Sequence, residues 1–142
     1  MDGWLLGKEA FIELLSGKGD PAKGVIQWAK SRGEASLYVS EMTWAVVRSI
    51  AESSSGLKRQ NWLDLLDREV PRQFGIRLLP VDRALLEIWS RVANEPVGAA
   101  NKPALIDESM EVATAIQYSL TYVVRESALA VKVRCPTESP WS

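Results

Sequence analysis

Short apolar runs alternate along the chain with stretches whose apolar residues recur at helical spacing, and this alternation predicts the class of fold. The apolar runs, rich in β-branched and aromatic residues, predict strands at 4–6, 37–39, 76–81, 120–124 and 131–133. Between them, apolar residues three and four positions apart predict helices over 10–15, 20–32, 43–51, 57–66, 82–92 and 103–116. Strands that alternate with helices predict an α/β fold, a three-layer α/β/α sandwich with a small, mostly parallel sheet.

Capping residues mark four of the predicted helix starts. Asp20 and Pro21 fit an N-cap followed by the first helical position, where the missing N–H of proline is harmless. Thr43 and Asp82 fit N-caps, and Pro103 fits the first turn of the helix that precedes the strand at 120–124. These residues set the expected beginnings of the helices.

The length and composition are typical of one folded unit. The chain has 142 residues, of which 46% are hydrophobic and 25% charged, so we expect a single domain over 1–142 with a C-terminal tail at 134–142. The net charge of −1 gives no overall positive field that would favour nucleic acid. The sequence contains no run of about 18 apolar residues and no leader pattern, so we expect no membrane-spanning segment. The single cysteine, Cys135, cannot form an internal disulfide, which fits a reducing cytoplasm.

The chain contains no histidine, which restricts the chemistry it can carry out. Histidine is the commonest general base, the partner of serine in nucleophilic catalysis and a frequent zinc ligand. One cysteine cannot form a thiolate zinc site either. Any metal site must therefore use carboxylates, which suit Mg²⁺ or Mn²⁺.

One acid, Asp107, falls in the first turn of the helix predicted over 103–116. There the helix macrodipole favours its charge, and free N–H groups can orient it. One interpretation is that Asp107 only helps to start the helix. The other is that it faces a metal site at the end of the sheet.

Five fragments of the chain occur in an order and spacing typical of one protein family. They are LLGKEAFIEL at 5–14, LYVSEMTWAVVRSI at 37–50, RLLPVD at 77–82, IDESMEVAT at 106–114 and YVVR at 122–125. They are similar to the family patterns LLDTNxxSEL, LxxSxxTxAExxxGI, RxLPVD, IDxxIAATA and a late strand with its VTRN turn. Over nearly all its length the chain thus resembles the PIN-domain family, and within it the VapC-type toxins of type II toxin–antitoxin pairs.

The resemblance implies a ribonuclease site in which about four acids hold one or two Mg²⁺ ions that activate water. The positions in register with those acids are Gly7, Val46, Asp107 and Leu129, so only Asp107 is retained. The resemblance therefore implies a VapC-like protein with a degenerate acid site, lost or impaired ribonuclease activity, and a role in binding a partner.

Two other interpretations of the acids remain open. The asparagine positions of the family carry Glu9 and Glu126, which could join Asp107 in a smaller cluster that holds Mg²⁺ or Mn²⁺ and still cleaves RNA. Further acids near this cluster would be Glu13, Glu41 and Glu108. Alternatively, all of these acids are solvated helix ends and surface charges.

The resemblance also predicts partners. It implies a homodimer and a small antitoxin protein whose segment occupies a groove, with RNA as a ligand only if nuclease activity persists. Six tryptophans are a high count for this length. Trp28, Trp44, Trp62 and Trp89 lie on predicted apolar stripes and are expected in the core, whereas Trp4 and Trp141 near the termini are candidates for an interface.

Overall fold

The core of the protein is a five-stranded sheet in which every neighbouring pair of strands is parallel. The computed structural model describes residues 2–17 and 24–142. The strand order is β3-β2-β1-β6-β7, with bounds β1 Trp4–Leu6, β2 Leu37–Ser40, β3 Leu78–Leu79, β6 Thr121–Val123 and β7 Thr137–Glu138. This confirms the predicted α/β class and the small parallel sheet.

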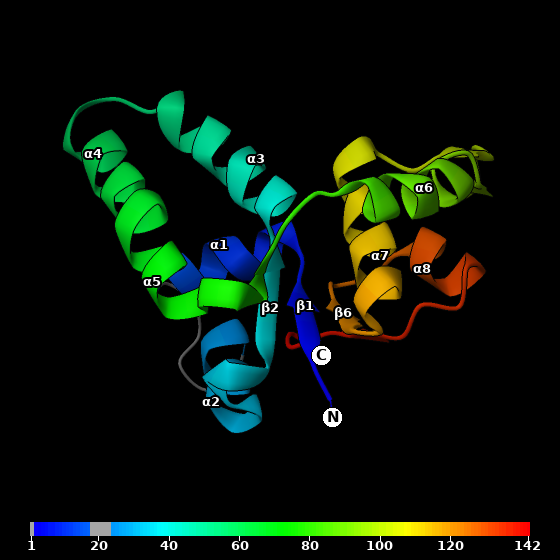
Figure 1. The fold of residues 1–142 in the computed structure, drawn as a ribbon, viewed down its shortest axis with the longest axis horizontal. Helices are drawn as coiled ribbons and strands as arrows, with labels where there is room; N and C mark the ends of the chain where they lie inside the picture. Colours follow the sequence, from blue (N-terminus) through cyan, green and yellow to red (C-terminus); the bar gives the residue numbers. More distant parts are fainter. Residues whose placement is uncertain (1, 18–23) are drawn as a thin grey trace.

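Helices cover both faces of this sheet (Figure 1). Their bounds are α1 Lys8–Ser16, α2 Val25–Arg32, α3 Glu41–Glu52, α4 Gly56–Asp64, α5 Val70–Phe74, α6 Arg83–Val92, α7 Ile106–Tyr118 and α8 Ala128–Lys132. Figure 1 shows α1, α4 and α5 on one side of the sheet and α6, α7 and α8 on the other. The arrangement confirms the predicted α/β/α sandwich.

Strand β1 shows how the two layers are held. Leu6 packs into a core with Phe11 of α1 and Val39 of β2, and Leu5 packs into a second core with Val112 of α7. Successive side chains of a strand point to opposite faces, so two adjacent leucines serve both layers. Among the described residues no helix is long and apolar enough to cross a bilayer.

Two of the predicted helix starts can be compared directly with the structure. Asp82 is the N-cap of α6, where its carboxylate accepts a hydrogen bond from the backbone N–H of Leu85 at 2.8 Å, as predicted. The prediction for Thr43 was wrong, because Ser40 is the N-cap of α3 and accepts from Met42 N at 3.1 Å. Thr43 lies one turn into that helix and is buried.

Other predicted helix and strand boundaries differ from those in the structure because of the local conformation of the chain. Pro103 belongs to β5 (Lys102–Pro103), which pairs antiparallel with β4 (Pro96–Val97), and α7 begins three residues later at Ile106. The predicted strand at 76–81 shrinks to β3, since Ile76 lies in a 3-10 turn and is exposed. The predicted cap at Asp20 and Pro21 lies outside the described residues.

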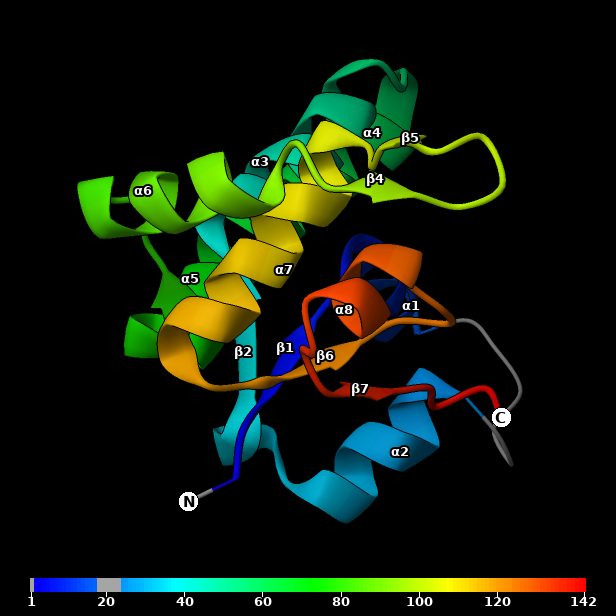
Figure 2. The same cartoon turned by 90° about the vertical axis from the view of Figure 1, so that its right-hand side faces the viewer.

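The largest correction concerns the C-terminal part. The segment predicted as a strand at 131–133 forms the end of helix α8 and its C-cap, Val133. The last strand, β7, lies in the predicted tail instead (Figure 2). The carboxylate of Glu138 on β7 accepts hydrogen bonds from the indole N–H groups of Trp4 and Trp28 and from Arg32 at 2.5 Å. Trp4 is therefore partly buried against the core, and Glu138 fixes the tail to the sheet.

The three central strands end at the same edge of the sheet. Gly7 follows β1, Glu41 follows β2 and Val124 follows β6. Asp107, at the beginning of α7, lies at this edge because its carboxylate contacts Lys8, the second residue after β1. The position of Asp107 at the carboxyl edge is the one predicted, and open α/β sheets place their ligand sites there.

Candidate functional site

A small pocket lies at the carboxyl edge of the sheet, where β1, β6 and α7 meet. It has a volume of about 210 Å³, and its walls include Glu9, Asp107 and Glu126, the three acids proposed from the sequence. Gly7, Lys8, Glu108, Glu111 and Tyr122 complete most of its lining. The structure therefore brings all three candidate acids to one place.

Gly7, in register with the first acid of the family, has no space for a side chain. Its φ of −71° and ψ of 169° are open to any residue, so the backbone does not require glycine. A Cβ atom built there would lie 2.9 Å from the carbonyl oxygen of Val123, 3.1 Å from the Tyr122 ring and 3.4 Å from Glu111 Oε1. An acid at this position would have to displace its neighbours.

Glu111 is the functional candidate that the sequence analysis missed. It lies one turn after Asp107 on α7 and is 4% exposed. Its Oε2 accepts from the Thr43 hydroxyl at 2.7 Å and its Oε1 accepts from the Tyr122 hydroxyl at 2.6 Å. The signal in the sequence was an acid on the apolar side of a helix, since Val112, Ala113 and Ala115 beside it are buried.

The environment of Glu111 favours its neutral form. Burial raises the pKa of Glu111 to about 7, although the hydrogen bonds from Tyr122 and Thr43 act in the opposite direction. Burial and the nearby charge of Glu111 also raise the pKa of Tyr122, so its hydroxyl stays a donor. A carboxyl of this kind can hold or release a proton near neutral pH.

Asp107, the acid that the resemblance aligns with a family acid, is bound by two donors. Lys8 Nζ lies 3.0 Å from its Oδ2, and the backbone N–H of Glu108 donates to its Oδ1 at 3.0 Å. Burial opposes ionisation of Asp107, but the hydrogen bond and the charge of Lys8 outweigh it and lower the pKa of Asp107 below its ordinary value. Asp107 is thus an ionised carboxylate with both oxygens in use.

The other two candidate acids differ in their surroundings. Glu9 forms an ion pair with Arg125 at 2.7 Å, and the Arg125 guanidinium also lies 4.3 Å from the centre of the Trp141 ring. Glu126 is exposed and makes no side-chain hydrogen bond or ion pair within the described parts of the chain. Only Glu126 is therefore free to bind a ligand without first losing a partner.

The remaining acids and family positions lie apart or are engaged. Glu108 accepts from the Ser127 hydroxyl at 2.5 Å, and Glu13 accepts from Val25 N at 2.8 Å on the far side of α1. Val46 is half-buried on α3, and Leu129 lies on α8 and is fully buried in the core. In the described residues no three Asp, Glu or Cys side chains are placed to share one metal ion. The side chains at this edge therefore do not fit the metal site that the fold family implies.

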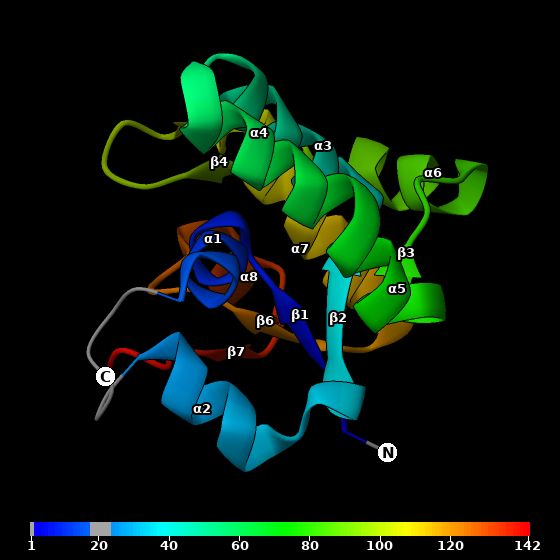
Figure 3. The same ribbon diagram turned by 90° about the vertical axis from the view of Figure 1, so that its left-hand side faces the viewer.

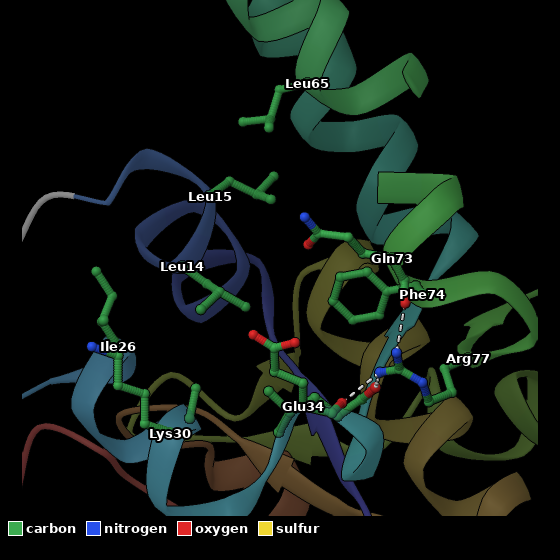
Figure 4. Close-up of a pocket in the computed structure, with 11 residues that line it drawn as sticks. Leu14, Leu15, Ile26, Lys30, Glu34, Leu65, Gln73, Phe74 and Arg77 are labelled. Carbon is green, nitrogen blue, oxygen red and sulfur yellow. Dashed lines mark hydrogen bonds between the residues drawn. The ribbon is translucent and has the colours of Figure 1, made fainter. Parts of the chain in front are cut away.

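A second, larger hollow lies on the other face of the sheet. A cavity of about 490 Å³ lies between α1, α2 and α5, and Figure 4 shows Leu14 and Leu15 on one side and Phe74 on the opposite side. Two smaller hollows continue it along α1 beneath α4. The one of about 180 Å³ shares Leu15 and Leu65 with the large cavity, and the one of about 260 Å³ shares Trp62 with the 180 Å³ hollow. Figure 3 shows α4 and α5 running beside α1. We call these three hollows the α1 groove.

One end of the α1 groove is rigid. The Arg77 guanidinium donates to the carbonyl oxygens of Glu34, Leu37 and Gln73, each at 2.6 Å (Figure 4). Five hydrogen-bond donors in a fixed plane allow one arginine to join three segments in this way. The apolar walls of the groove are thereby held open between α2, β2 and α5.

The protonation of Glu111 predicts how stability depends on pH. The folded-state pKa of about 7 lies above the ordinary value of 4.5, so the folded state favours the protonated acid and stability falls as pH rises through this range. We expect the free energy of unfolding of the wild type, measured relative to Glu111→Gln, to drop by roughly 3 kcal/mol between pH 4.5 and pH 8. Urea unfolding followed by tryptophan fluorescence measures this difference. Glu87→Gln, at an exposed site on α6, is the control. If the difference in free energy of unfolding between the wild type and Glu111→Gln does not change with pH, the raised pKa of Glu111 is contradicted.

Comparison with known proteins identifies the fold. No protein-family model and no curated protein sequence matches the chain. Among solved structures, FitAcB from Neisseria gonorrhoeae aligns with a TM-score of 0.82 at 23% identity, covering 97% of this chain and 98% of that one. FitAB bound to a DNA fragment aligns with a TM-score of 0.81 at 21% identity over 98% and 96% of the two chains. DNA-bound VapBC from Salmonella typhimurium aligns with a TM-score of 0.73 at 16% identity over 100% of both chains.

These FitAB and VapBC structures share the VapC-type PIN-like fold. The alignments extend over nearly the whole chain, so the similarity includes both helical layers and the sheet between them. The chain therefore has the VapC-type PIN-like fold that the five sequence fragments predicted.

Proposed function

We propose that this chain is a VapC-toxin-like protein that acts in the cytoplasm by binding an antitoxin-type partner, and that its ordinary metal-dependent RNA cleavage is lost or impaired. The observation that carries the proposal is the lack of room for a side chain at Gly7. The carbonyl oxygen of Val123, the Tyr122 ring and the Glu111 carboxyl crowd the position of a Cβ atom at Gly7, which the resemblance aligns with the first family acid. Two further family acids are replaced by Val46 and Leu129.

The lost acids matter because of what Mg²⁺ requires. Mg²⁺ gives up its hydration shell reluctantly and is held by carboxylates in near-octahedral geometry. A nucleophilic water must also be placed accurately, and an error of about 1 Å can reduce the rate on the order of 100-fold. With one acid of the family set in register, neither condition is met by Asp107 alone.

The α1 groove supports the binding role. Its walls are mostly apolar, and grooves of this kind accept the apolar face of an amphipathic helix through anchors at helical spacing. The FitAcB, FitAB and VapBC structures are themselves complexes. We therefore propose a small antitoxin-type protein as the partner, with an apolar helical segment in the α1 groove.

A second candidate function is a rewired nuclease. Glu9, Asp107 and Glu126 line one pocket, and Glu126 is free of a partner among the described residues. If a metal ion drew Glu9 away from Arg125, three carboxylates would face it. This alternative requires two ion pairs to break, at Arg125 and at Lys8, and we therefore rank it second.

The nuclease assay separates the two candidates. We expect the wild type to show little or no cleavage of a structured RNA with Mn²⁺, at least about 100-fold below an active PIN-domain nuclease assayed alongside. Asp107→Asn is measured in parallel. Robust Mn²⁺-dependent cleavage that disappears in Asp107→Asn would establish the rewired nuclease, and cleavage that survives the substitution would reveal a contaminant.

The partner assay introduces a negative charge into the apolar wall of the groove. Leu15→Asp places a charge in the wall of the α1 groove, whereas Val131→Asp places one at a residue of α8 that is already 74% exposed. In pull-downs from the host, we expect Leu15→Asp to lose the partner by at least tenfold while Val131→Asp keeps it, since tenfold corresponds to about 1.4 kcal/mol. Equal capture by both variants would place the partner elsewhere on the molecule.

Homodimerisation remains a prediction of the resemblance. Apolar side chains are exposed around the beginning of α6 and the end of α7, at Val81, Leu86, Ile116 and Tyr118. A standard interface of roughly 1,600 Å² is stable at micromolar concentration. We expect light scattering to give twice the 15.7 kDa mass of one chain, and a single-chain mass would contradict the prediction.

A further inference from the structure

The Lys8–Asp107 ion pair combines a cation with the one family acid that remains. Lys8 is the first residue of α1 and directly follows Gly7, and its side chain is 40% exposed against 24% for Asp107. Both residues therefore lie at the pocket wall, not on open surface. The pair joins two residues far apart in the sequence at the edge where the ligand of such a sheet is expected.

The position of Lys8 is unfavourable without Asp107. A helix begins with the positive end of its macrodipole, which disfavours a cation in the first turn. Asp107 lies in the first turn of α7, where its negative charge is favoured and Glu108 N donates to it. The Asp107 carboxylate thus offsets the positive charge of the Lys8 ammonium and of the N-terminal ends of α1 and α7.

Both oxygens of Asp107 are occupied by this arrangement. Oδ2 accepts from Lys8 Nζ at 3.0 Å and Oδ1 accepts from the backbone of Glu108 at 3.0 Å. A divalent ion that bound Oδ2 would have to stand beside the ammonium or displace it. Like charges repel strongly at a partly buried site, because little water screens them.

The neighbouring acids do not offset the repulsion between the Lys8 ammonium and a divalent ion at Asp107. Glu9 is paired with Arg125, and Glu108 accepts from Ser127. Glu111 is buried between Thr43 and Tyr122 and faces the space at Gly7. Within the described residues, Lys8 is the only side-chain cation paired with Asp107.

We infer that Lys8 is a built-in counter-ion of Asp107. The Lys8 ammonium takes the position that a divalent cation would need, so the pocket does not bind a metal ion. This inference deepens the proposed function and rests on it. It explains how the pocket keeps an ionised carboxylate without a metal ion. It also assigns the exclusion of metal to one side chain, beyond the loss of family acids.

The test removes the charge and measures metal binding directly. Mn²⁺ titrations by calorimetry are carried out on the wild type, Lys8→Met, Lys8→Arg and the control Lys132→Met. The Lys132 amine, on α8, lies 3.9 Å from the carboxylate of Glu95, which precedes β4. We expect Lys8→Met to bind Mn²⁺ at least about tenfold more tightly than the wild type, while Lys8→Arg and Lys132→Met behave like the wild type. The gain should disappear in Lys8→Met combined with Asp107→Asn.

Two outcomes would overturn the inference. One is wild-type Mn²⁺ binding as tight as that of Lys8→Met, and the other is a folded Lys8→Met that gains no affinity. If Lys8→Met does not fold, the wild type is tested by NMR with added Mn²⁺, whose paramagnetism broadens the signals of nearby residues. We expect the signals of Lys8 and Asp107 to stay sharp. Selective broadening of these signals would reject the inference. Neither readout involves RNA cleavage or partner capture, so failure here is distinct from failure of the proposed function.

Discussion

The buried carboxyl of Glu111 joins three elements of the fold at the end of the sheet. It lies on α7, and it accepts hydrogen bonds from Thr43 of α3 and Tyr122 of β6. A buried polar group is costly when it lacks partners, and these two hydroxyls satisfy both oxygens. The interaction therefore fixes α3, α7 and β6 relative to one another around the end of β1, and it fills the space beside Gly7.

The chemistry of the pocket follows from that constraint. In a nuclease of this fold the edge would carry ionised carboxylates that converge on metal ions. Here one carboxyl is buried with a raised pKa, one is paired with Lys8 and one with Arg125. These three carboxyls are engaged within the protein, and among the candidate acids of the pocket only Glu126 lacks a side-chain partner in the described residues. The number of acids at such an edge therefore does not by itself determine whether a metal ion binds there.

The two faces of the sheet have different roles in the proposed function. The α6, α7 and α8 layer supplies Asp107 and Glu111 to the compensated pocket, and Arg77 holds the α1 groove open on the opposite face. The proposed binding role depends on the shape and apolar character of the groove, and not on the carboxylates of the pocket on the other side of the sheet.

The sequence by itself determined the class of fold, four of the five strands of the sheet, the cap of α6 and the place of Asp107. These features depend on periodicity and on residues close to one another in the chain, which are visible in the sequence. The resemblance aligns Gly7, Val46 and Leu129 with family acids, and their replacement stays a prediction from the local patterns of the sequence. The last strand was missed because β7 is two residues long and is stabilised by Trp4, Trp28 and Arg32 from the other end of the chain.

The tertiary structure decided which charges neutralise which. Thr43 reads as a helix cap in the sequence, yet it donates to Glu111 across 68 positions. Lys8 and Asp107 are 99 positions apart, and Glu9 and Arg125 are 116 apart. Pairings at such distances depend on how two helices and the sheet pack, because the energy of a charge is set by its neighbours in space and by its exposure to water. No local pattern contains that information, so the sequence named the acids and only the folded chain decided what they bind.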